Sequence, residues 1–279
     1  MTVVYQGEPG AYSEAAALAL LPDTRPRGLE TFYLVFEAVA SGRAARGVVP
    51  VENSIGGSVG GVVGALFTFE DIRVVAEHWV PIEHALLAPA GSKLGDLREI
   101  RSHPQALAQC AATLRDLVPQ ATLVAADDTA GAARQLAEAK TPGVAAVASR
   151  RAGELYGLTV LADHVESEGP NVTRFFLIAP KDAEIEQAPN RTTLVIAPKQ
   201  EVPNALFRSL TAFVGRRLAV HRLEPRSRPG LPGNYRYLVD VDGDAEHEPL
   251  VSAFADLAPL NDEVRVVGSY AAAVIPSRD

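Results

Sequence analysis

Between residues 100 and 157 the chain alternates three times between a short apolar run and a longer segment with helical periodicity. Taken in order, the pairs are 100–102 with 106–117, 122–125 with 130–139, and 144–148 with 150–156. Strands that alternate with helices predict a parallel sheet, because each helix serves as the crossover between neighbouring strands. This pattern therefore predicts an α/β fold, with all three strand-to-helix junctions at one edge of the sheet.

Polar side chains occupy each of these junctions. They are His103 and Gln105 at the first, Thr129 after two aspartates at the second, and Ser149 at the third. A sheet edge that collects such residues is where open α/β folds build binding sites. Residues that cap helix N-termini have the same chemistry, so capping alone remains an equally good interpretation of each junction.

Two further segments combine polar residues with glycines. A strand at 3–5 leads into a Gly/Pro loop and a helix expected at 14–21, with Ser13 as its N-cap. Another strand, at 47–51, delivers Glu52, Asn53 and Ser54 to its carboxyl end, and a glycine-rich run follows. The first loop can cradle an anion on its backbone N–H groups, although a simple βα turn is the commoner explanation of such a loop. The second can bring its backbone close to a ligand and is equally compatible with an Asx-type cap and a flexible hinge.

The run Asn171-Val172-Thr173-Arg174-Phe175 places an amide, a hydroxyl and a guanidinium at the mouth of an apolar strand. The chain leaves the first group of elements between 73 and 88 and returns to it between 158 and 170. Two lobes joined by two crossings predict a cleft between them, which is the usual place for a small-molecule site.

After a charged, proline-containing linker at 181–190, the chain has one further α/β unit. Its expected order is strand–helix–strand–strand–helix–strand, with elements at 192–197, 204–214, 219–223, 235–241, 249–258 and 264–270. This is the ferredoxin-like βαββαβ order. The unit has no cluster of nucleophile and base, so we interpret it as a regulatory or dimerising module.

Composition excludes several classes of protein. A net charge of −8 argues against nucleic-acid binding, and a single cysteine, Cys110, excludes an internal disulfide framework and fits a reducing compartment. The N-terminus lacks the features of a signal peptide, and no apolar run approaches the ~18 residues that cross a membrane. We therefore expect a cytoplasmic protein without membrane contact. No metal-spaced Cys/His set, Walker loop or dinucleotide fingerprint appears, which indicates a site without metal or cofactor.

Six segments together resemble the monofunctional prephenate dehydratases over nearly the whole chain. They are 7–13, 49–59, 102–110, 128–130, 148–149 with 156–158, and 171–175. The resemblance implies a two-lobed catalytic region with a fold like that of type 2 periplasmic binding proteins, followed by a ferredoxin-like ACT domain. The implied boundaries are 1–180 for the catalytic domain, with lobe 1 at about 1–76 and 162–180 and lobe 2 at about 77–161. The linker is then 181–190 and the ACT domain 191–279.

The resemblance also implies an activity, the conversion of prephenate to phenylpyruvate with loss of carbon dioxide and of the ring hydroxyl. In that family the threonine matching Thr173 assists departure of the hydroxyl, Asn53 and Gln105 match catalytic positions, and Arg174 matches a substrate-binding one. A threonine hydroxyl is a poor acid, so we expect Thr173 to donate a hydrogen bond to the leaving oxygen. The proton itself comes from water or a relay, for which His103 is the candidate.

Prephenate carries two carboxylates with opposite needs. The retained pyruvyl carboxylate benefits from tight pairing, which the Arg174 fork can provide. The ring carboxylate must depart, and a strong ion pair would stabilise its ground state. We therefore expect neutral donors around it: Asn53, Ser54, Gln105, and helix N-termini near Thr129 and Ser149. Ser13, His103 and Phe175 complete the expected substrate-binding set, with Phe175 packing against or shielding the substrate.

The C-terminal module departs from the family pattern at two places. Asn204-Ala205-Leu206 stands where the family has Gly-Ala-Leu, and Glu224-Pro225-Arg226-Ser227 stands where it has Glu-Ser-Arg-Pro. These are the expected allosteric residues, and the resemblance implies L-phenylalanine as effector and a homodimer or homotetramer. Two alternatives stay open: an arogenate dehydratase, with the same chemistry on an aminated side chain, and a non-catalytic two-lobed amino-acid sensor.

Overall fold

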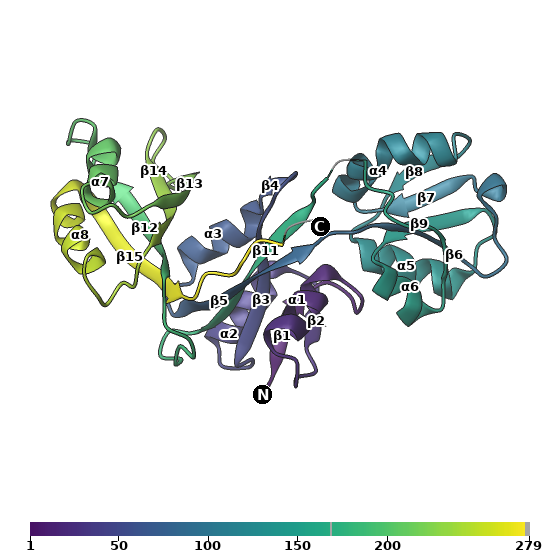
Figure 1. Cartoon of the computed structure of the whole chain (residues 1–279), viewed down its shortest axis with the longest axis horizontal. Helices are drawn as coiled ribbons and strands as arrows, with labels where there is room; N and C mark the ends of the chain where they lie inside the picture. The colour runs from purple at the N-terminus through teal and green to yellow at the C-terminus, as the bar shows by residue number, and fades with distance from the viewer. Residues whose placement is uncertain (168, 277–279) are drawn as a thin grey trace.

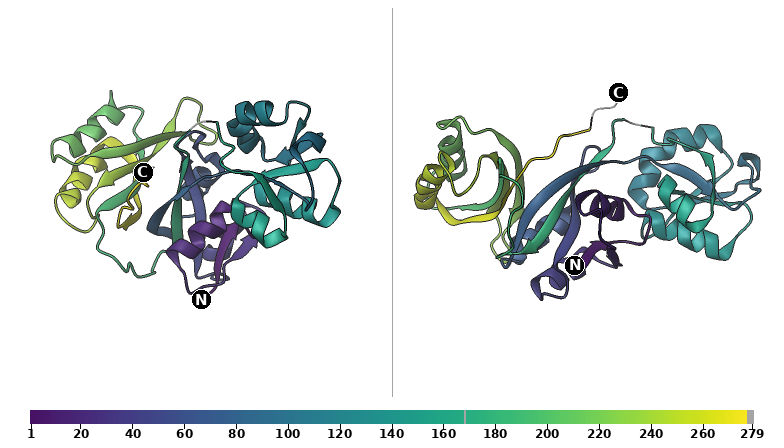
Figure 2. Two further views of the ribbon diagram at one scale, coloured as in Figure 1. Left: turned by 45° about the vertical axis from the view of Figure 1, so that its right-hand side comes forward. Right: turned by 60° about the horizontal axis from the view of Figure 1, so that its bottom comes forward.

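The computed structural model describes residues 1–167 and 169–276. Glu168, in the polar segment of the sequence that leads back to lobe 1, and residues 277–279 lie outside the described residues. Three α/β bodies follow one another along the longest axis of the molecule (Figure 1). The C-terminal module lies at one end, lobe 1 in the middle and lobe 2 at the other end, and this order is also visible in the turned views (Figure 2). The predicted α/β class and the two-lobed catalytic region are confirmed.

Lobe 1 is built on a six-stranded sheet. Its strands are β1 (Val3–Gln6), β2 (Arg27–Leu29), β3 (Arg46–Asn53), β4 (Gly57–Ser58), β5 (Ile72–Pro81) and β11 (Val172–Pro180). The order is β2-β1-β3-β11-β5, with β4 paired to β3. β1 is parallel to β2 and β3, and β11 is antiparallel to β3 and β5. The returning strand β11 is thus inserted between two strands, β3 and β5, that come from the first 81 residues of the chain.

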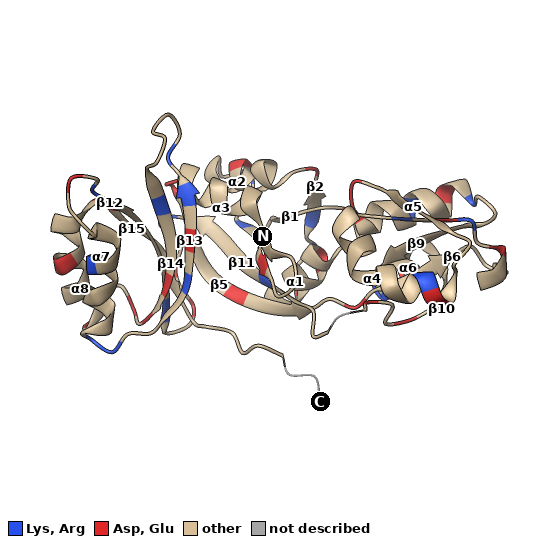
Figure 3. Ribbon diagram, turned by 90° about the horizontal axis from the view of Figure 1, so that it is seen from above, with Lys and Arg blue, Asp and Glu red and all other residues tan. Residues whose placement is uncertain are grey.

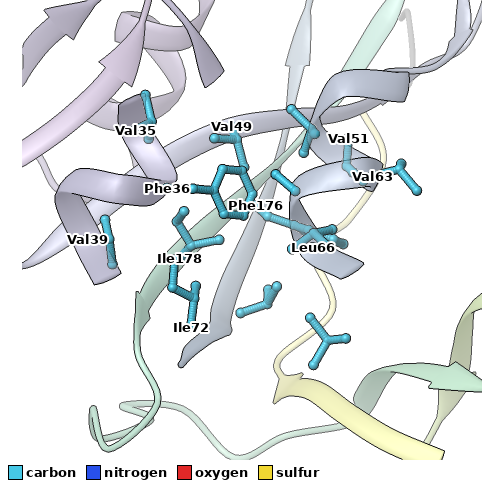
Figure 4. Close-up of a cluster of buried hydrophobic side chains, with 14 of the residues drawn as sticks. Val35, Phe36, Val39, Val49, Val51, Val63, Leu66, Ile72, Phe176 and Ile178 are labelled. Atoms are coloured by element: carbon cyan, nitrogen blue, oxygen red, sulfur yellow. The ribbon is translucent and has the colours of Figure 1, made fainter. Parts of the chain in front are cut away.

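Three helices cover this sheet: α1 (Tyr12–Leu20), α2 (Phe32–Ala40) and α3 (Gly60–Thr68). Apolar side chains of α2 and α3 pack onto those of β3, β5 and β11, and Phe36 and Phe176 are completely buried among them (Figure 4). The Thr31 hydroxyl accepts a hydrogen bond from Leu34 N at the start of α2, which satisfies one of the helix's free donors. This core packs β3 and β11 against the helices, and both strands carry candidate catalytic residues.

Lobe 2 contains a five-stranded sheet in the order β10-β6-β9-β7-β8. Its strands are β6 (Ala85–Ala88), β7 (Glu99–Ser102), β8 (Thr122–Ala125), β9 (Val144–Ala148) and β10 (Thr159–Ala162), with a 3₁₀ turn at Leu94–Asp96. The helices are α4 (Pro104–Leu117), α5 (Thr129–Ala139) and α6 (Arg150–Tyr156). β7 runs parallel to both β8 and β9, as the alternating pattern predicts.

Helix capping at the three junctions of lobe 2 is confirmed. His103, Asp128 and Ser149 are the N-caps of α4, α5 and α6, and each side chain accepts a hydrogen bond from a backbone N–H in the first turn. The crossing between lobes comes later than expected, because β5 continues to Pro81 and the expected boundary at residue 76 falls inside it. β11 begins at Val172, after the return crossing.

The C-terminal module has the elements β12 (Arg191–Pro198), α7 (Ala205–Val214), β13 (Val220–Ser227), β14 (Tyr235–Asp242), α8 (Leu250–Leu257) and β15 (Asn261–Tyr270), with a 3₁₀ turn at Ala258–Leu260. The antiparallel order β13-β14-β12-β15 is the predicted ferredoxin-like arrangement. Helices α7 and α8 cover one face of this sheet. No helix in the described part of the chain is long and apolar enough to span a membrane.

The other face of the module's sheet packs directly on lobe 1. Val195, Leu238, Val267 and Tyr270 belong to the same buried cluster as the core of lobe 1. Gly268 is required at this contact, because a Cβ there would collide with the backbone carbonyl of Val74 on β5. The module and lobe 1 therefore share a continuous hydrophobic core.

Candidate functional site

A cavity of about 480 Å³ lies between the two lobes. Lobe 1 contributes Gln6, Gly7, Ala11, Tyr12, Ser13, Phe32, Pro50, Asn53, 56–59, Ile82, Thr173 and Phe175; lobe 2 and the crossing contribute His84, His103, Gln105, Ala106, Gln109 and 127–129. The size is typical of small-molecule sites. Of the predicted catalytic and substrate-binding residues, Ser13, Asn53, His103, Gln105, Thr129, Thr173 and Phe175 line it.

Asn53 and Thr173 form the centre of the cavity. They are paired across the β3–β11 ladder, and Asn53 Nδ2 donates to Thr173 Oγ1 at 2.9 Å. Asn53 Oδ1 accepts from the backbone N–H groups of Ile55 and Gly56 at 3.1 and 2.6 Å, which fixes the orientation of the amide. Because Thr173 Oγ1 already accepts a bond from Asn53, its own proton is available to donate into the cavity.

A chain of buried amides extends from this pair toward lobe 2. Asn53 Nδ2 also donates to Asn171 Oδ1 at 2.7 Å, and Asn171 Nδ2 donates to Gln109 Oε1 at 3.0 Å. His84 Nε2 lies 3.2 Å from the same Gln109 oxygen, and Tyr12 Oη lies 3.1 Å from His84 Nδ1. The amide oxygen can only accept, so His84 carries its proton on Nε2 and leaves Nδ1 facing the Tyr12 hydroxyl, whose proton is donated mainly to Glu83 O at 2.6 Å.

Burial favours the neutral forms of the two rings in this chain. Burial lowers the pKa of His84, against the opposing effects of the Gln109 hydrogen bond and of Glu166. Burial, followed by Glu166, raises the pKa of Tyr12 well above its ordinary value. The network from Tyr12 to Thr173 is therefore uncharged and continuous, an arrangement that holds reacting groups in one geometry.

Tyr12, His84, Gln109 and Asn171 were not among the sequence-derived site residues. Tyr12, Gln109 and Asn171 lie inside three of the segments that carry the family resemblance, so the sequence gave a signal for each of them. His84 gave none, because a single histidine between Glu83 and an apolar run does not show which strand or lobe faces it.

Gln105 reaches the cavity from the first turn of α4. Its side-chain amide lies so close to Gly56 that a Cβ at that position would collide with Nε2. His103 is exposed at the start of the same helix, and its Nδ1 accepts from Gln105 N at 3.3 Å. In the neutral ring this leaves the proton on His103 Nε2, which takes no part in the cap and can serve as a donor.

The N-terminal ends of α1, α4 and α5 all reach this cavity, at Tyr12 and Ser13, at Gln105, and at Thr129. The expected Ser13 cap is wrong, because α1 begins at Tyr12 and Ala11 is its N-cap; Ser13 lies within the first turn. Among the described lining residues none is a lysine or an arginine, and Asp127 and Asp128 are present. Positive potential for a carboxylate therefore comes from helix ends and neutral N–H donors.

Arg174 lies outside the cavity, in contrast to its expected role in substrate binding. Successive side chains of a strand point to opposite faces, so Thr173 and Phe175 face the cavity and Arg174 faces the C-terminal module. Its Nε donates to Glu77 at 2.7 Å and its Nη1 to Asp240 at 2.6 Å and Glu52 at 3.2 Å. Burial by itself lowers the pKa of Arg174, but Asp240 and the other acidic neighbours outweigh it and raise that pKa.

Ser54 and Ser149 also lie away from the cavity lining, and their hydroxyls are already hydrogen bonded. Ser54 Oγ donates to Pro170 O and accepts from Val172 N, both at 3.0 Å, which clamps the end of β3 to the start of β11. Ser149 Oγ donates to Gly10 O at 2.7 Å and accepts from Ala152 N at 3.0 Å. Ser149 thus fastens the N-terminal loop of lobe 1 to lobe 2.

The structure places the expected allosteric residues around two separate hollows. Asn204, Ala205 and Leu206 line one of about 320 Å³ in the C-terminal module, together with Tyr235 and Tyr237. Arg226 and Ser227 line another of about 380 Å³, between the module and α3. Within one chain the 204–206 segment and the 224–227 segment therefore do not line the same hollow. Glu224 lines neither of these two hollows and forms an ion pair with Arg226 at 3.1 Å.

Asn204 adopts a left-handed conformation, with φ 56°, at the start of α7. This explains why asparagine can stand here in place of the family's glycine, because these two residues tolerate the left-handed conformation better than others do. The asparagine side chain makes no capping hydrogen bond.

The amino-acid sequence of this chain is similar to those of known dehydratases. The family model described as prephenate dehydratase matches residues 3–183. Arogenate dehydratase 1 of Petunia hybrida is 38% identical over 298 residues, which cover 100% of this chain and 69% of that protein.

Two solved structures are similar along almost the whole chain. A prephenate dehydratase from Arthrobacter aurescens in complex with L-Phe has 31% identity and a TM-score of 0.89, covering 99% of this chain and 93% of that one. A structure described as GqqA, a novel type of quorum quenching acylase, has 33% identity and a TM-score of 0.87, covering 98% of each chain.

Proposed function

The chain belongs to the prephenate dehydratase family and is a carbon–oxygen lyase of aromatic amino-acid biosynthesis, and we propose that its substrate is prephenate. Prephenate loses its ring carboxylate as carbon dioxide and its ring hydroxyl as water, and phenylpyruvate remains. The observation that carries this proposal is the hydroxyl of Thr173, which accepts from Asn53 and so keeps its proton for a group in the cavity.

In the proposed reaction the bond between the ring and its carboxylate carbon breaks, and its electron pair enters the ring. The opposite carbon–oxygen bond breaks at the same time, and the departing oxygen takes that bond's electron pair. Thr173 donates a hydrogen bond to this oxygen as its negative charge grows, which is worth more in the transition state than in the ground state. One proton converts the departing hydroxide to water, and His103 at the exposed start of α4 is our candidate donor.

The carboxylates of the substrate meet neutral donors in this cavity. Asn53 and Gln105, with the N-terminal ends of α1, α4 and α5, surround the space without a fixed cation among the described lining residues. A weakly paired ring carboxylate favours its own departure, since strong pairing would lower the energy of the ground state. Arg174, on the other face of β11, is not part of this recognition.

Measurement of phenylpyruvate formation from prephenate by absorbance tests the proposal. We expect turnover by the wild-type protein, and a large loss of kcat in Thr173→Ala with substrate binding retained. Thr173→Ser keeps the hydroxyl and is the matched control. Absence of turnover in the wild type, or full kcat in Thr173→Ala, would contradict the proposed function.

Arogenate is the second candidate substrate, and Asp127 favours it. Arogenate replaces the keto group of prephenate with an ammonium group. A carboxylate in a lining that has no Lys or Arg among the described residues attracts this ammonium group more strongly than the neutral keto group of prephenate. We expect Asp127→Asn to lower kcat/KM for arogenate relative to that for prephenate. An unchanged ratio would show that Asp127 does not recognise the amine.

An acylase activity, as described for the similar structure GqqA, is less favoured. Nucleophilic acyl transfer needs a base within hydrogen-bond reach of a serine or cysteine. Both ring nitrogens of His84 contact Tyr12 and Gln109 instead, and His103 Nδ1 contacts the backbone of Gln105. Burial, with Glu166, raises the pKa of Cys110 to about 12, which keeps that thiol protonated and unreactive.

We further propose that the C-terminal module is an ACT domain with L-phenylalanine as its effector and that the protein is a cytoplasmic homodimer or homotetramer. Support comes from the ferredoxin-like topology and from the similarity to a prephenate dehydratase solved with L-Phe. Activity and assembly state measured with and without phenylalanine test this. Identical values would leave the module without this regulatory role.

A further inference from the structure

Two adjacent residue pairs of β3 and β11 have opposite surroundings. Asn53 and Thr173 form the hydrogen-bonded pair that faces the cavity. The preceding residue of β3, Glu52, pairs in register with the following residue of β11, Arg174, and these two side chains face the C-terminal module. One peptide unit on each strand thus separates the candidate catalytic groups from a charged cluster on the other face.

The centre of that cluster is buried and joins lobe 1 to the C-terminal module. Arg174 is 3% exposed, Glu77 6% and Asp240 completely buried. Glu77 comes from β5 of lobe 1, whereas Asp240 comes from β14 of the module. The hydroxyl of Tyr270 on β15 accepts from Arg174 Nη2 at 3.1 Å, and Thr193 on β12 donates to Asp240 Oδ1 at 2.7 Å. Arg174 is therefore bonded directly to two strands of the module's sheet, β14 and β15, and Thr193 on β12 holds both of its partners.

The charges explain why this contact is rigid. The cluster contains three carboxylates, on Glu52, Glu77 and Asp240, around Arg174, with Arg222 of the module 3.6 Å from Glu52 as a second cation. Buried carboxylates are stable only while they are paired, so the guanidinium cannot leave without a large cost. The strands β13 and β14, which carry several charged residues, accordingly lie beside lobe 1 (Figure 3).

We propose that Arg174 is a positioning residue, which transmits the placement of the C-terminal module to the Asn53–Thr173 pair. A shift of Asp240 and Tyr270 moves Arg174, and β11 moves with it because the adjacent Thr173 shares its backbone. The Thr173 hydroxyl then leaves its hydrogen-bonded position beside Asn53. This inference rests on the proposed catalytic role of Thr173, and it identifies a structural route by which an event in the module changes turnover.

The informative variants weaken the module's side of the cluster and leave Arg174 in place. Asp240→Asn removes one charge but retains an oxygen for Arg174, and Tyr270→Phe removes only a hydroxyl. Replacement of Arg174 itself would leave the buried carboxylates of Glu77 and Asp240 without their cation and would destabilise the whole fold. The matched control is Arg265→Gln, because Arg265 crosses the same junction to the carbonyls of Leu66 and Phe67 on α3.

Hydrogen exchange of the β11 amides gives a readout that does not depend on activity. We expect peptides containing 172–177 to exchange about fivefold faster in Asp240→Asn, less so in Tyr270→Phe, and at the wild-type rate in Arg265→Gln. Unchanged exchange in the first two variants, or an equal increase in Arg265→Gln, would overturn the inference. Wild-type turnover of prephenate tests the proposed function separately, so the two failures are distinguishable.

Kinetics provides the second readout. For Asp240→Asn we expect kcat to fall about tenfold while KM stays within about twofold, because displacement of Thr173 removes an interaction that matters in the transition state. A purely structural role would lower the amount of folded enzyme and leave kcat per folded molecule unchanged. That result, with or without faster exchange, would also overturn the inference.

Discussion

Asn53 and Thr173 are 120 residues apart in sequence and face each other across the β3–β11 ladder, with the amide donating to the hydroxyl at 2.9 Å. The direction of this bond determines what Thr173 can do. An oxygen that accepts from Asn53 directs its own proton elsewhere, and the open space beside it is the cavity between the lobes.

Replacement of Thr173 by alanine should therefore lower kcat by about 10²–10³, the usual effect of removing one donor to a developing oxyanion. KM should change little, because the hydrogen bond strengthens only as the carbon–oxygen bond breaks. Steady-state kinetics with Thr173→Ser as control measures both parameters. A rise in KM at constant kcat would show that the hydroxyl binds the substrate instead.

Gly56→Ala should displace Gln105 from the cavity, since the new Cβ would occupy the place of its side-chain amide. Gln105 is exposed and flexible, so it can move without unfolding the protein. We expect kcat/KM to fall by roughly 10- to 100-fold for this small misplacement, with little change in Tm.

Gly64→Ala on α3 is the matched control for Gly56→Ala. Nothing lies within 4 Å of a Cβ at Gly64, and its backbone is helical. That variant should keep full activity and gain about 0.4–1 kcal/mol of stability. Equal activity of the two variants would show that Gly56 does not serve to admit Gln105.

His84 should make the stability of the protein depend on pH below its ordinary pKa of 6.5. Burial lowers the pKa of His84 in the folded state, so the unfolded chain binds a proton first as the pH falls. Stability is then unaffected above pH 6.5 and decreases from there toward the lowered native pKa. Wild-type Tm should fall more steeply over this range than that of His84→Gln, whose amide still donates to Gln109. Parallel curves would contradict a buried neutral His84.

Asn204 should tolerate glycine better than alanine. Its left-handed φ of 56° is easy for glycine and costs alanine about 1 kcal/mol, so Asn204→Ala should lower Tm by about 2–4 °C. Asn204→Gly should keep the fold and enlarge the hollow at the start of α7. We expect a stronger effect of phenylalanine on activity in Asn204→Gly, measured by titration. An identical response in the wild type would show that the asparagine does not obstruct the effector.

Much of the fold was predictable because it depends on local patterns. Helical periodicity and strand-forming runs predicted the parallel core of lobe 2 and the βαββαβ order of the module, and both are observed. Capping by Ser149 was equally local, because an N-cap needs only its own first turn. The start of α1 was mispredicted, because Ala11 occupies the cap without any side-chain signal.

The amino-acid sequence by itself determined which groups this protein can use: the amides of Asn53 and Gln105 and the hydroxyl of Thr173, each at the end of a strand or the start of a helix. Only the tertiary structure decided which of them meet. Strand alternation places Thr173 toward the cavity and Arg174 toward Asp240, more than 60 residues away, and brings His84 to Gln109. The physical reason is that the surroundings of each side chain depend on the order of the strands in the sheet and on the neighbouring lobe or module. Neither can be read from residues 171–175 alone.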